Sequence, residues 1–128
     1  MTIAEVSKKY NISQDTLRYY ERVGMIPPVN RTPGGLRDYR DEDCRWIELA
    51  KCMRSAGLPI EAMIEYVRLF QEGDETIAAR LKLLTDQRER LLEQKNSIES
   101  MLDRLNYKIS RYEAAVETGV LSWEDGNV

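Results

Sequence analysis

The longest stretch of this chain without proline or glycine runs from Asp74 to Thr118. A continuous helix over these residues would be about 65 Å long, at a rise of 1.5 Å per residue. That length exceeds the diameter of a small domain, so the helix cannot be buried within its own chain. The segment therefore predicts a helix that pairs with another helix.

Apolar side chains follow a heptad repeat through this segment, which is typical of a coiled coil. One unbroken row holds Ile77, Leu84, Leu91, Ile98, Leu105 and Tyr112. The partner row holds Leu81, Leu102, Ile109 and Val116, and is interrupted by Arg88 and Lys95. A single helix with this exposed stripe would be insoluble or unfolded, so we expect a homodimer through about residues 77–116. The two cations would set the register or an antiparallel choice of partner, at some cost in stability.

Helix-capping signals divide residues 1–24 into two short helices. Thr2 and Glu5 form a capping box, while Ser13 caps a second helix that Gly24 ends. Two short helices joined by a tight turn suggest helix-turn-helix, although many such hairpins carry no function. This part of the chain is also basic: residues 1–40 carry a net charge of +3, hidden within a total of −3.

The next residues predict a hairpin and two further helices. The turn Pro33-Gly34-Gly35 lies between two short polar segments, a pattern that favours a small β-hairpin. Asp41 is expected to cap a helix through Ala56. Residues 59–72 predict a fourth helix, opened by a proline and closed by a glycine.

Arginine, tyrosine and hydroxyl side chains cluster on the second helix, where Arg18 and Arg22 share one face. Contacts to DNA phosphates and base edges need this mixture of groups. A solvated basic face with packed tyrosines, without any DNA contact, would give the same sequence pattern. A second basic-aromatic cluster on the hairpin, Arg31 and Arg37 with Tyr39, favours a winged DNA-binding module.

The order and spacing of these motifs resemble the MerR family of bacterial transcription regulators over residues 1–72. The resemblance rests on Thr16-Leu17-Arg18-Tyr19-Tyr20-Glu21-Arg22-Val23-Gly24-Met25-Ile26, on Gly35-Leu36-Arg37-Asp38-Tyr39, and on residues 47–58. It implies a mainly α fold: a winged helix-turn-helix domain (1–73), an antiparallel coiled-coil dimerisation helix (74–118) and a tail (119–128). The tail's Trp123 is expected to pack back on the dimer.

The resemblance also implies a function and the residues that perform it. A homodimer would bind a pseudo-palindromic operator in double-stranded promoter DNA and distort it, so that RNA polymerase can use the promoter. Major-groove and phosphate contacts would come from Ser13, Gln14, Thr16 and Arg18. Phosphate or sugar contacts would come from Tyr19, Tyr20 and Arg22, and wing contacts from Arg37 and Tyr39. Tyr39 is alternatively a core residue under the wing. Lys8 and Lys9 are either backbone contacts or ordinary surface lysines.

The inducer is less constrained by the sequence. Cys52 lies where the aldehyde- and thiol-stress-responsive branch of the family carries its proposed sensor, which predicts modification by a small electrophile. Alternatively, Cys52 is a small buried hydrophobe and the chain senses a reversible apolar ligand near Met63, Tyr66, Tyr112 and Trp123. Cys44 is expected to be structural or merely exposed.

The amino-acid composition argues against several other classes of protein. The chain has no histidine and only two cysteines, so we expect no metal, no cofactor, and no enzyme built on a histidine base. It lacks a secretory or membrane-spanning segment, which predicts a cytoplasmic protein with no membrane partner. A coiled-coil adaptor that binds proteins remains as an alternative of a different class.

Overall fold

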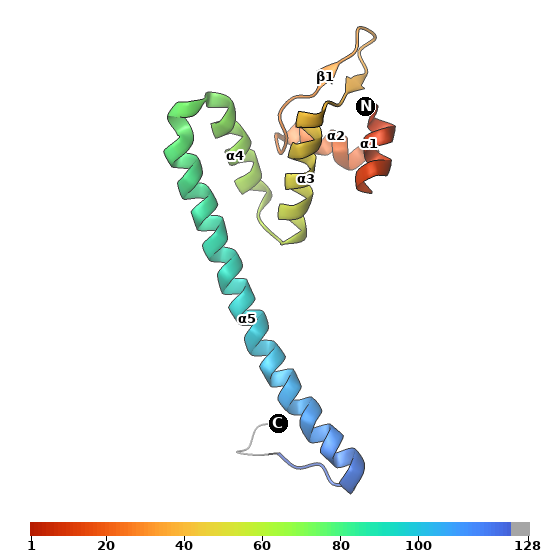
Figure 1. Ribbon diagram of the computed structural model, residues 1–128, viewed down its shortest axis with the longest axis vertical. Helices are drawn as coiled ribbons and strands as arrows, with labels where there is room; N and C mark the ends of the chain where they lie inside the picture. The colour runs from red at the N-terminus through yellow and green to blue at the C-terminus, as the bar shows by residue number, and fades with distance from the viewer. Residues whose placement is uncertain (124–128) are drawn as a thin grey trace. The chain divides into compact units, whose positions relative to one another are not determined.

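A computed structural model describes residues 1–123, which form helices and one small hairpin (Figure 1). The elements are α1 (Ile3–Tyr10), α2 (Gln14–Val23), β1 (Asn30–Arg31), β2 (Arg37–Asp38), α3 (Asp41–Ser55), α4 (Ile60–Glu72), the 3-10 turn η1 (Asp74–Thr76) and α5 (Ile77–Thr118). This confirms the mainly α class with a hairpin wing and a long C-terminal helix. The chain divides into two compact units, at Met1–Arg88 and from Glu89 onward, and each is described by itself. None of the helices within residues 1–123 is long and apolar enough to cross a membrane.

The first two helices begin and end where their capping residues require. The Thr2 side chain accepts the Glu5 amide, and the Ser13 side chain accepts the amide of Thr16. Gly24 ends α2 in the left-handed conformation, with φ of 88°, which a residue with a side chain would adopt only under strain. The capping signals in these residues therefore predicted the starts of both helices and the end of the second correctly.

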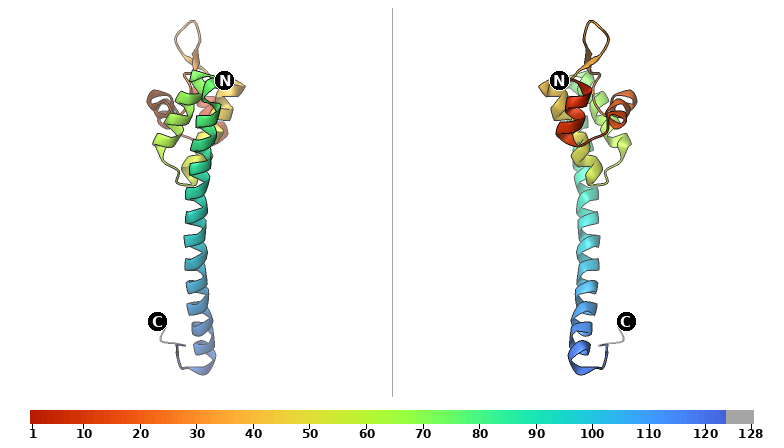
Figure 2. Two further views of the ribbon diagram at one scale, coloured as in Figure 1. Left: turned by 90° about the vertical axis from the view of Figure 1, so that its left-hand side faces the viewer. Right: turned by 90° about the vertical axis from the view of Figure 1, so that its right-hand side faces the viewer.

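The wing is a two-stranded antiparallel hairpin in which Asn30 pairs with Asp38 and Arg31 with Arg37. In two further views its loop extends beyond the helices of its unit (Figure 2). The start of the chain lies beside the wing, because Met1 and Tyr39 exchange backbone hydrogen bonds of 2.7 and 2.8 Å. The wing is thus attached at its base to Met1, two residues before the start of α1.

The core of the first unit is formed by side chains from α1 to α4 and the loops between them. Its fully buried members are Val6, Leu17, Met25, Ile26, Tyr39, Ile47 and Met63. The third helix starts slightly differently from the expectation: Arg40, not Asp41, is the cap residue, and its amide donates to the Asp43 carboxylate at 2.8 Å. Asp43 is buried and can accept this bond, whereas Asp41 is exposed.

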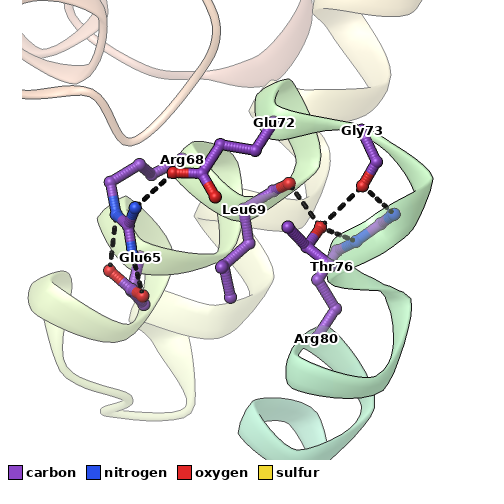
Figure 3. A network of polar contacts seen from close by, with 7 residues as sticks. All are labelled: Glu65, Arg68, Leu69, Glu72, Gly73, Thr76 and Arg80. Carbon is purple, nitrogen blue, oxygen red and sulfur yellow. Dashed lines mark hydrogen bonds and ion pairs between the residues drawn. The ribbon is translucent and has the colours of Figure 1, made fainter.

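A polar network joins α4 to the start of α5 (Figure 3). The buried Thr76 hydroxyl lies 2.6 Å from the Leu69 carbonyl and 2.8 Å from the Gly73 carbonyl, so its single proton is shared between them. Arg80 donates to Thr76 Oγ1 and to the Gly73 carbonyl. These bonds satisfy carbonyls that the end of α4 leaves without helical partners, and they fix the turn between the helices.

Helix α5 is continuous over 42 residues, as the absence of proline and glycine indicated. It begins at Ile77 and not at Asp74 as expected, because residues 74–76 form the 3-10 turn η1. None of its side chains is buried within the described chain. Its heptad residues instead rank among the exposed large apolar side chains: Ile77, Leu81, Leu84, Ile98, Leu102, Leu105, Ile109, Tyr112 and Val116. Leu91 is half-buried.

The described part of the C-terminal tail folds back on its own helix. The Trp123 ring lies 5.8 Å from Tyr112 and 6.4 Å from Tyr107, with the Lys108 ammonium 4.9 Å away. Trp123 thus contacts α5 of its own chain. The remainder of the expected tail, residues 124–128, lies outside the described residues.

Candidate nucleic-acid interface

The face of α2 that points away from the core carries polar and cationic side chains. Arg18 is exposed and reaches Asp15 Oδ1 at 3.0 Å and Gln14 Oε1 at 3.3 Å. At the start of the helix, the Ser13 hydroxyl donates to Thr16 Oγ1 at 2.8 Å. Surface ion pairs such as Arg18–Asp15 are worth at most about 1 kcal/mol, so Arg18 can exchange Asp15 for a stronger partner.

The second turn of α2 separates the tyrosines that the sequence grouped together. Arg22 is exposed, and its guanidinium lies 5.5 Å from the centre of the Tyr19 ring, so the two form one surface cluster. Tyr20 is only 8% exposed, and burial raises the pKa of its hydroxyl. The structure therefore places the ring of Tyr20 in the core, whereas Tyr19 and Arg22 form a cluster at the surface.

Glu21 links α2 to the wing, a role that the sequence reading did not assign. Its carboxylate accepts the Val29 amide at 2.7 Å and Arg37 Nε at 2.7 Å, and it lies 3.4 Å from Arg31. The side chain is 11% exposed. An acidic residue within a basic helix, followed by two arginines on a hairpin, was the signal available in the sequence.

Hydrogen bonding holds the pKa of Glu21 below its usual range. Burial alone would raise this pKa, but the bonds from Val29 and Arg37 and the charge of Arg31 together outweigh it. A carboxyl with a lowered folded-state pKa contributes stability above its unfolded-state pKa. That contribution disappears as the pH falls through the folded-state value.

We therefore expect Glu21→Gln to lower the free energy of unfolding at pH 7 by about 2 kcal/mol, since charged hydrogen bonds are lost. The variant should also lose less stability than the parent as the pH falls below about 4.3, the pKa of a glutamate in the unfolded state. Urea unfolding from pH 7 to pH 3, at fixed protein concentration, measures both. As a control, Glu61→Gln removes an exposed carboxyl of α4. It should change neither the free energy of unfolding at pH 7 nor its decrease at acid pH. Equal acid sensitivity of parent and Glu21→Gln would contradict this role.

A groove of about 560 Å³ runs between α2, the start of α1 and the wing. Three guanidinium-bearing residues line it: Arg18 from α2, and Arg31 and Arg37 from the wing. Because Glu21 occupies Nε of Arg37, the orientation of that guanidinium is fixed. The carboxylates of Glu5 and Asp38 line the groove as well. The planar head groups of the three arginines can bind phosphate oxygens with several donors at once.

Tyr39 lies under the wing, as the alternative reading had it. Its side chain is 1% exposed, and its hydroxyl has no hydrogen-bond partner among the described residues. Burial raises its pKa. The ring supports the base of the hairpin, while Arg31 and Arg37 face the groove.

The two cysteines of α3 differ in exposure. Cys44 is buried, which agrees with a structural role, and Cys52 is exposed, which removes the reading of Cys52 as a buried hydrophobe. The lysine beside Cys52 is engaged, since Lys51 Nζ donates to the Tyr10 carbonyl at 2.5 Å. Arg54 donates to the Leu58 carbonyl at 2.6 Å.

An aromatic cluster lies between α3 and α4. The Trp46 ring packs 5.0 Å from Phe70 and 5.7 Å from Tyr66, and the three rings line a shallow groove of about 270 Å³. Met63, which the sequence reading placed beside a ligand, is fully buried.

Comparison with known proteins shows where this arrangement recurs. Residues 1–69 match the MerR HTH family regulatory protein. The chain is 59% identical over 93 residues to the HTH-type transcriptional regulator AdhR of Bacillus subtilis, a match that covers 73% of this chain. The same match spans 66% of AdhR, just under two thirds of its length. An uncharacterized HTH-type transcriptional regulator of Haemophilus influenzae is 32% identical over 92% of this chain and 87% of its own.

Solved structures agree over nearly the whole chain. A MerR family transcriptional regulator from Listeria monocytogenes superposes with a TM-score of 0.90 at 44% identity, over 93% of this chain and 90% of that one. HiNmlR, a MerR family regulator that lacks the sensor domain, was solved bound to promoter DNA. It gives a TM-score of 0.82 at 32% identity, over 94% of this chain and 95% of that one. The family match, the relatives and the winged helix-turn-helix with its long helix lead to one conclusion: this chain belongs to the MerR family of DNA-binding transcription regulators.

Proposed function

We propose that the chain acts as a homodimer that binds a pseudo-palindromic promoter operator and distorts it to control transcription by RNA polymerase. The observation that carries this proposal is the groove in which α2 and the wing present Arg18, Arg31 and Arg37 together. The DNA-bound state of HiNmlR supports it by similarity. Two copies joined through α5 would present two such surfaces to two half-sites.

Each residue of this surface that is not buried receives a role in the proposal. Ser13, Gln14, Thr16 and Arg18 contact the major groove and its phosphates, at the N-terminal end of α2. Tyr19, Arg22 and Arg37 contact phosphates or sugars beside it. The rings of Tyr20 and Tyr39 are buried, so we assign both to support of this surface. Phosphate contacts would fix the position of the dimer, and a changed spacing between the two surfaces would untwist the DNA.

Genome-wide footprinting followed by gel shifts tests this function. We expect protection of an inverted repeat upstream of a small number of genes, and binding that weakens steeply with salt. A coiled-coil adaptor would show no salt-sensitive sequence preference. The absence both of protected sites and of a salt-sensitive gel shift would therefore overturn the proposal in favour of the adaptor.

For the inducer we propose a small electrophile that modifies Cys52, which is exposed on α3. With an aldehyde, the thiol sulfur would bond to the carbonyl carbon and its proton would pass to the carbonyl oxygen. The reaction turns a small apolar group into a larger polar one, on the helix that follows the wing.

The Cys52→Ala variant should keep operator affinity within about twofold of the parent, because Cys52 lies outside the proposed DNA surface. It should lose induction by aldehydes in a promoter-reporter assay. Cys44→Ala tests the other, buried thiol and should retain induction. Undiminished induction in Cys52→Ala would eliminate the thiol sensor while leaving the DNA-binding function intact.

A second candidate for the inducer is a reversible apolar ligand, favoured by the aromatic groove of Trp46, Tyr66 and Phe70. Glu42, Arg45 and Leu49 complete the lining of this groove, and aromatic walls with a few polar groups are typical of small-molecule sites. A ligand bound there should quench tryptophan fluorescence in a Trp123→Phe variant and leave the protein mass unchanged. A covalent adduct on Cys52 instead would favour the first candidate.

A further inference from the structure

Asp15 places a negative charge on the same helix as Arg18, at the surface proposed to contact DNA. Its side chain is 95% exposed, and its Oδ1 lies 3.0 Å from the Arg18 guanidinium. The other carboxylate side chains of residues 1–40 contact groups of the fold itself, and they belong to Glu5, Glu21 and Asp38. Asp15 instead contacts a side chain that the DNA would engage.

The geometry of α2 brings three polar side chains together at its N-terminal end. Residues three and four positions apart share one face of a helix, so Gln14 and Asp15 both lie beside Arg18. The terminal nitrogens of Arg18 donate to Asp15 Oδ1 at 3.0 Å and to Gln14 Oε1 at 3.3 Å. Leu17 and Tyr20 are buried and attach the other side of the helix to the core. A base edge that reaches this end of α2 would therefore meet an amide, a carboxylate and a guanidinium.

Binding of Arg18 to DNA would take the partner of Asp15 away. In the proposed function, on which this inference rests, the guanidinium turns from the carboxylate to phosphate oxygens or to a guanine edge. A carboxylate left unpaired where DNA excludes water is strongly disfavoured, and the phosphates repel it. Asp15 therefore requires a hydrogen-bond donor that belongs to the DNA.

The major groove offers few donors to a carboxylate. Guanine O6 and N7 and thymine O4 are acceptors, so they repel it, whereas the amino groups of cytosine and adenine are donors. Adenine presents the acceptor N7 beside its amino group, which repels the second oxygen of the carboxylate. Cytosine presents a C–H group at that place. The chemistry of Asp15 thus favours cytosine over the other three bases.

We propose that Asp15 is a specificity-determining residue that accepts a hydrogen bond from the N4 amino group of one cytosine in each half-site. This cytosine lies in or next to the base pair that Arg18 contacts, because residues three apart advance about 4.5 Å along a helix and base pairs about 3.4 Å along DNA. On a sequence without the cytosine, the Asp15–Arg18 pair stays closed and Arg18 is withheld from the DNA.

Operators with modified bases test this assignment in the full-length chain. Each cytosine of the footprinted operator is replaced in turn, in both half-sites, by N4-methylcytosine. This base still pairs with guanine but presents a methyl group to the major groove in place of the N4 hydrogen. At one symmetric position, the parent should lose at least about tenfold in affinity and Asp15→Ala less than about twofold, since only the parent has a hydrogen bond to lose.

The scrambled duplex gives a second measurement with the opposite sign. Asp15→Ala should bind it more tightly than the parent does, because a dimer loses two negative charges that the phosphates repel. The matched control is Glu5→Gln, which removes a negative charge that lines the same groove. This control should bind both duplexes more tightly and keep the full sensitivity of the parent to N4-methylcytosine.

Asp15 also lies in the first turn of α2, where a negative charge favours the start of a helix. If that were its whole role, Asp15→Ala would change the affinity for every duplex by the same factor, and this result would overturn the assignment. Relaxed discrimination only at an adenine, measured with N6-methyladenine, would overturn it too. A parent that binds operator and scrambled duplex equally would instead overturn the proposed function itself.

Discussion

Replacing Arg18 with alanine is expected to lower operator affinity by at least about 30-fold, without unfolding the protein. A good bidentate contact of arginine with a base edge contributes about 1–3 kcal/mol, and a dimer loses two such contacts. The folded state loses little, since its partners Asp15 and Gln14 are on the surface of the same helix. Titration of a labelled operator duplex measures the affinity, and circular dichroism checks the fold.

Arg104→Ala provides the matched control for Arg18→Ala. It removes the same charge from an exposed position on α5, outside the proposed DNA surface. We expect it to change operator affinity by less than about twofold. An equal loss of affinity in both variants would mean that net charge, and not the surface of α2, determines binding.

Leu91→Asp is expected to have an effect of similar size through a different part of the molecule. In the proposed dimer the new carboxylate would lie in the apolar seam between two α5 helices, where an unpaired charge costs several kcal/mol. The dimer should dissociate at micromolar concentration. Operator affinity should fall at least 100-fold, because each chain would then bind one half-site alone. Sedimentation velocity and the same operator titration measure the two effects.

Ser100→Asp places the same charge on α5 outside both heptad rows, at an exposed position. This variant should remain dimeric and bind the operator as the parent does. A dimer that persists in Leu91→Asp would show that the apolar face of α5 does not hold the two chains together.

The parts of the fold that depend on local rules could be predicted from the sequence. Ser13 and Gly24 bounded the second helix, because caps and left-handed residues act within one turn. The 42-residue helix followed from the absence of proline and glycine. The hairpin strands followed from the turn residues between them.

Burial and long-range pairing could not be predicted in the same way. Tyr19 and Tyr20 are adjacent, and only the packing of α2 on the core shows that the second ring is buried. The bonds of Glu21 to Val29 and Arg37 join residues 8 and 16 positions apart, which no local pattern specifies. Exposure of Cys52 likewise depends on which face of α3 the other helices cover.

The most direct test of the proposed function is equilibrium binding of the full-length chain to its footprinted operator and to a scrambled duplex of equal length. We expect two chains per operator duplex and at least about 10³-fold weaker binding to the scrambled duplex. We also expect affinity for both duplexes to fall steeply as salt rises. Equal affinity for the two duplexes, or one chain per operator, would contradict the proposal of a sequence-specific homodimer.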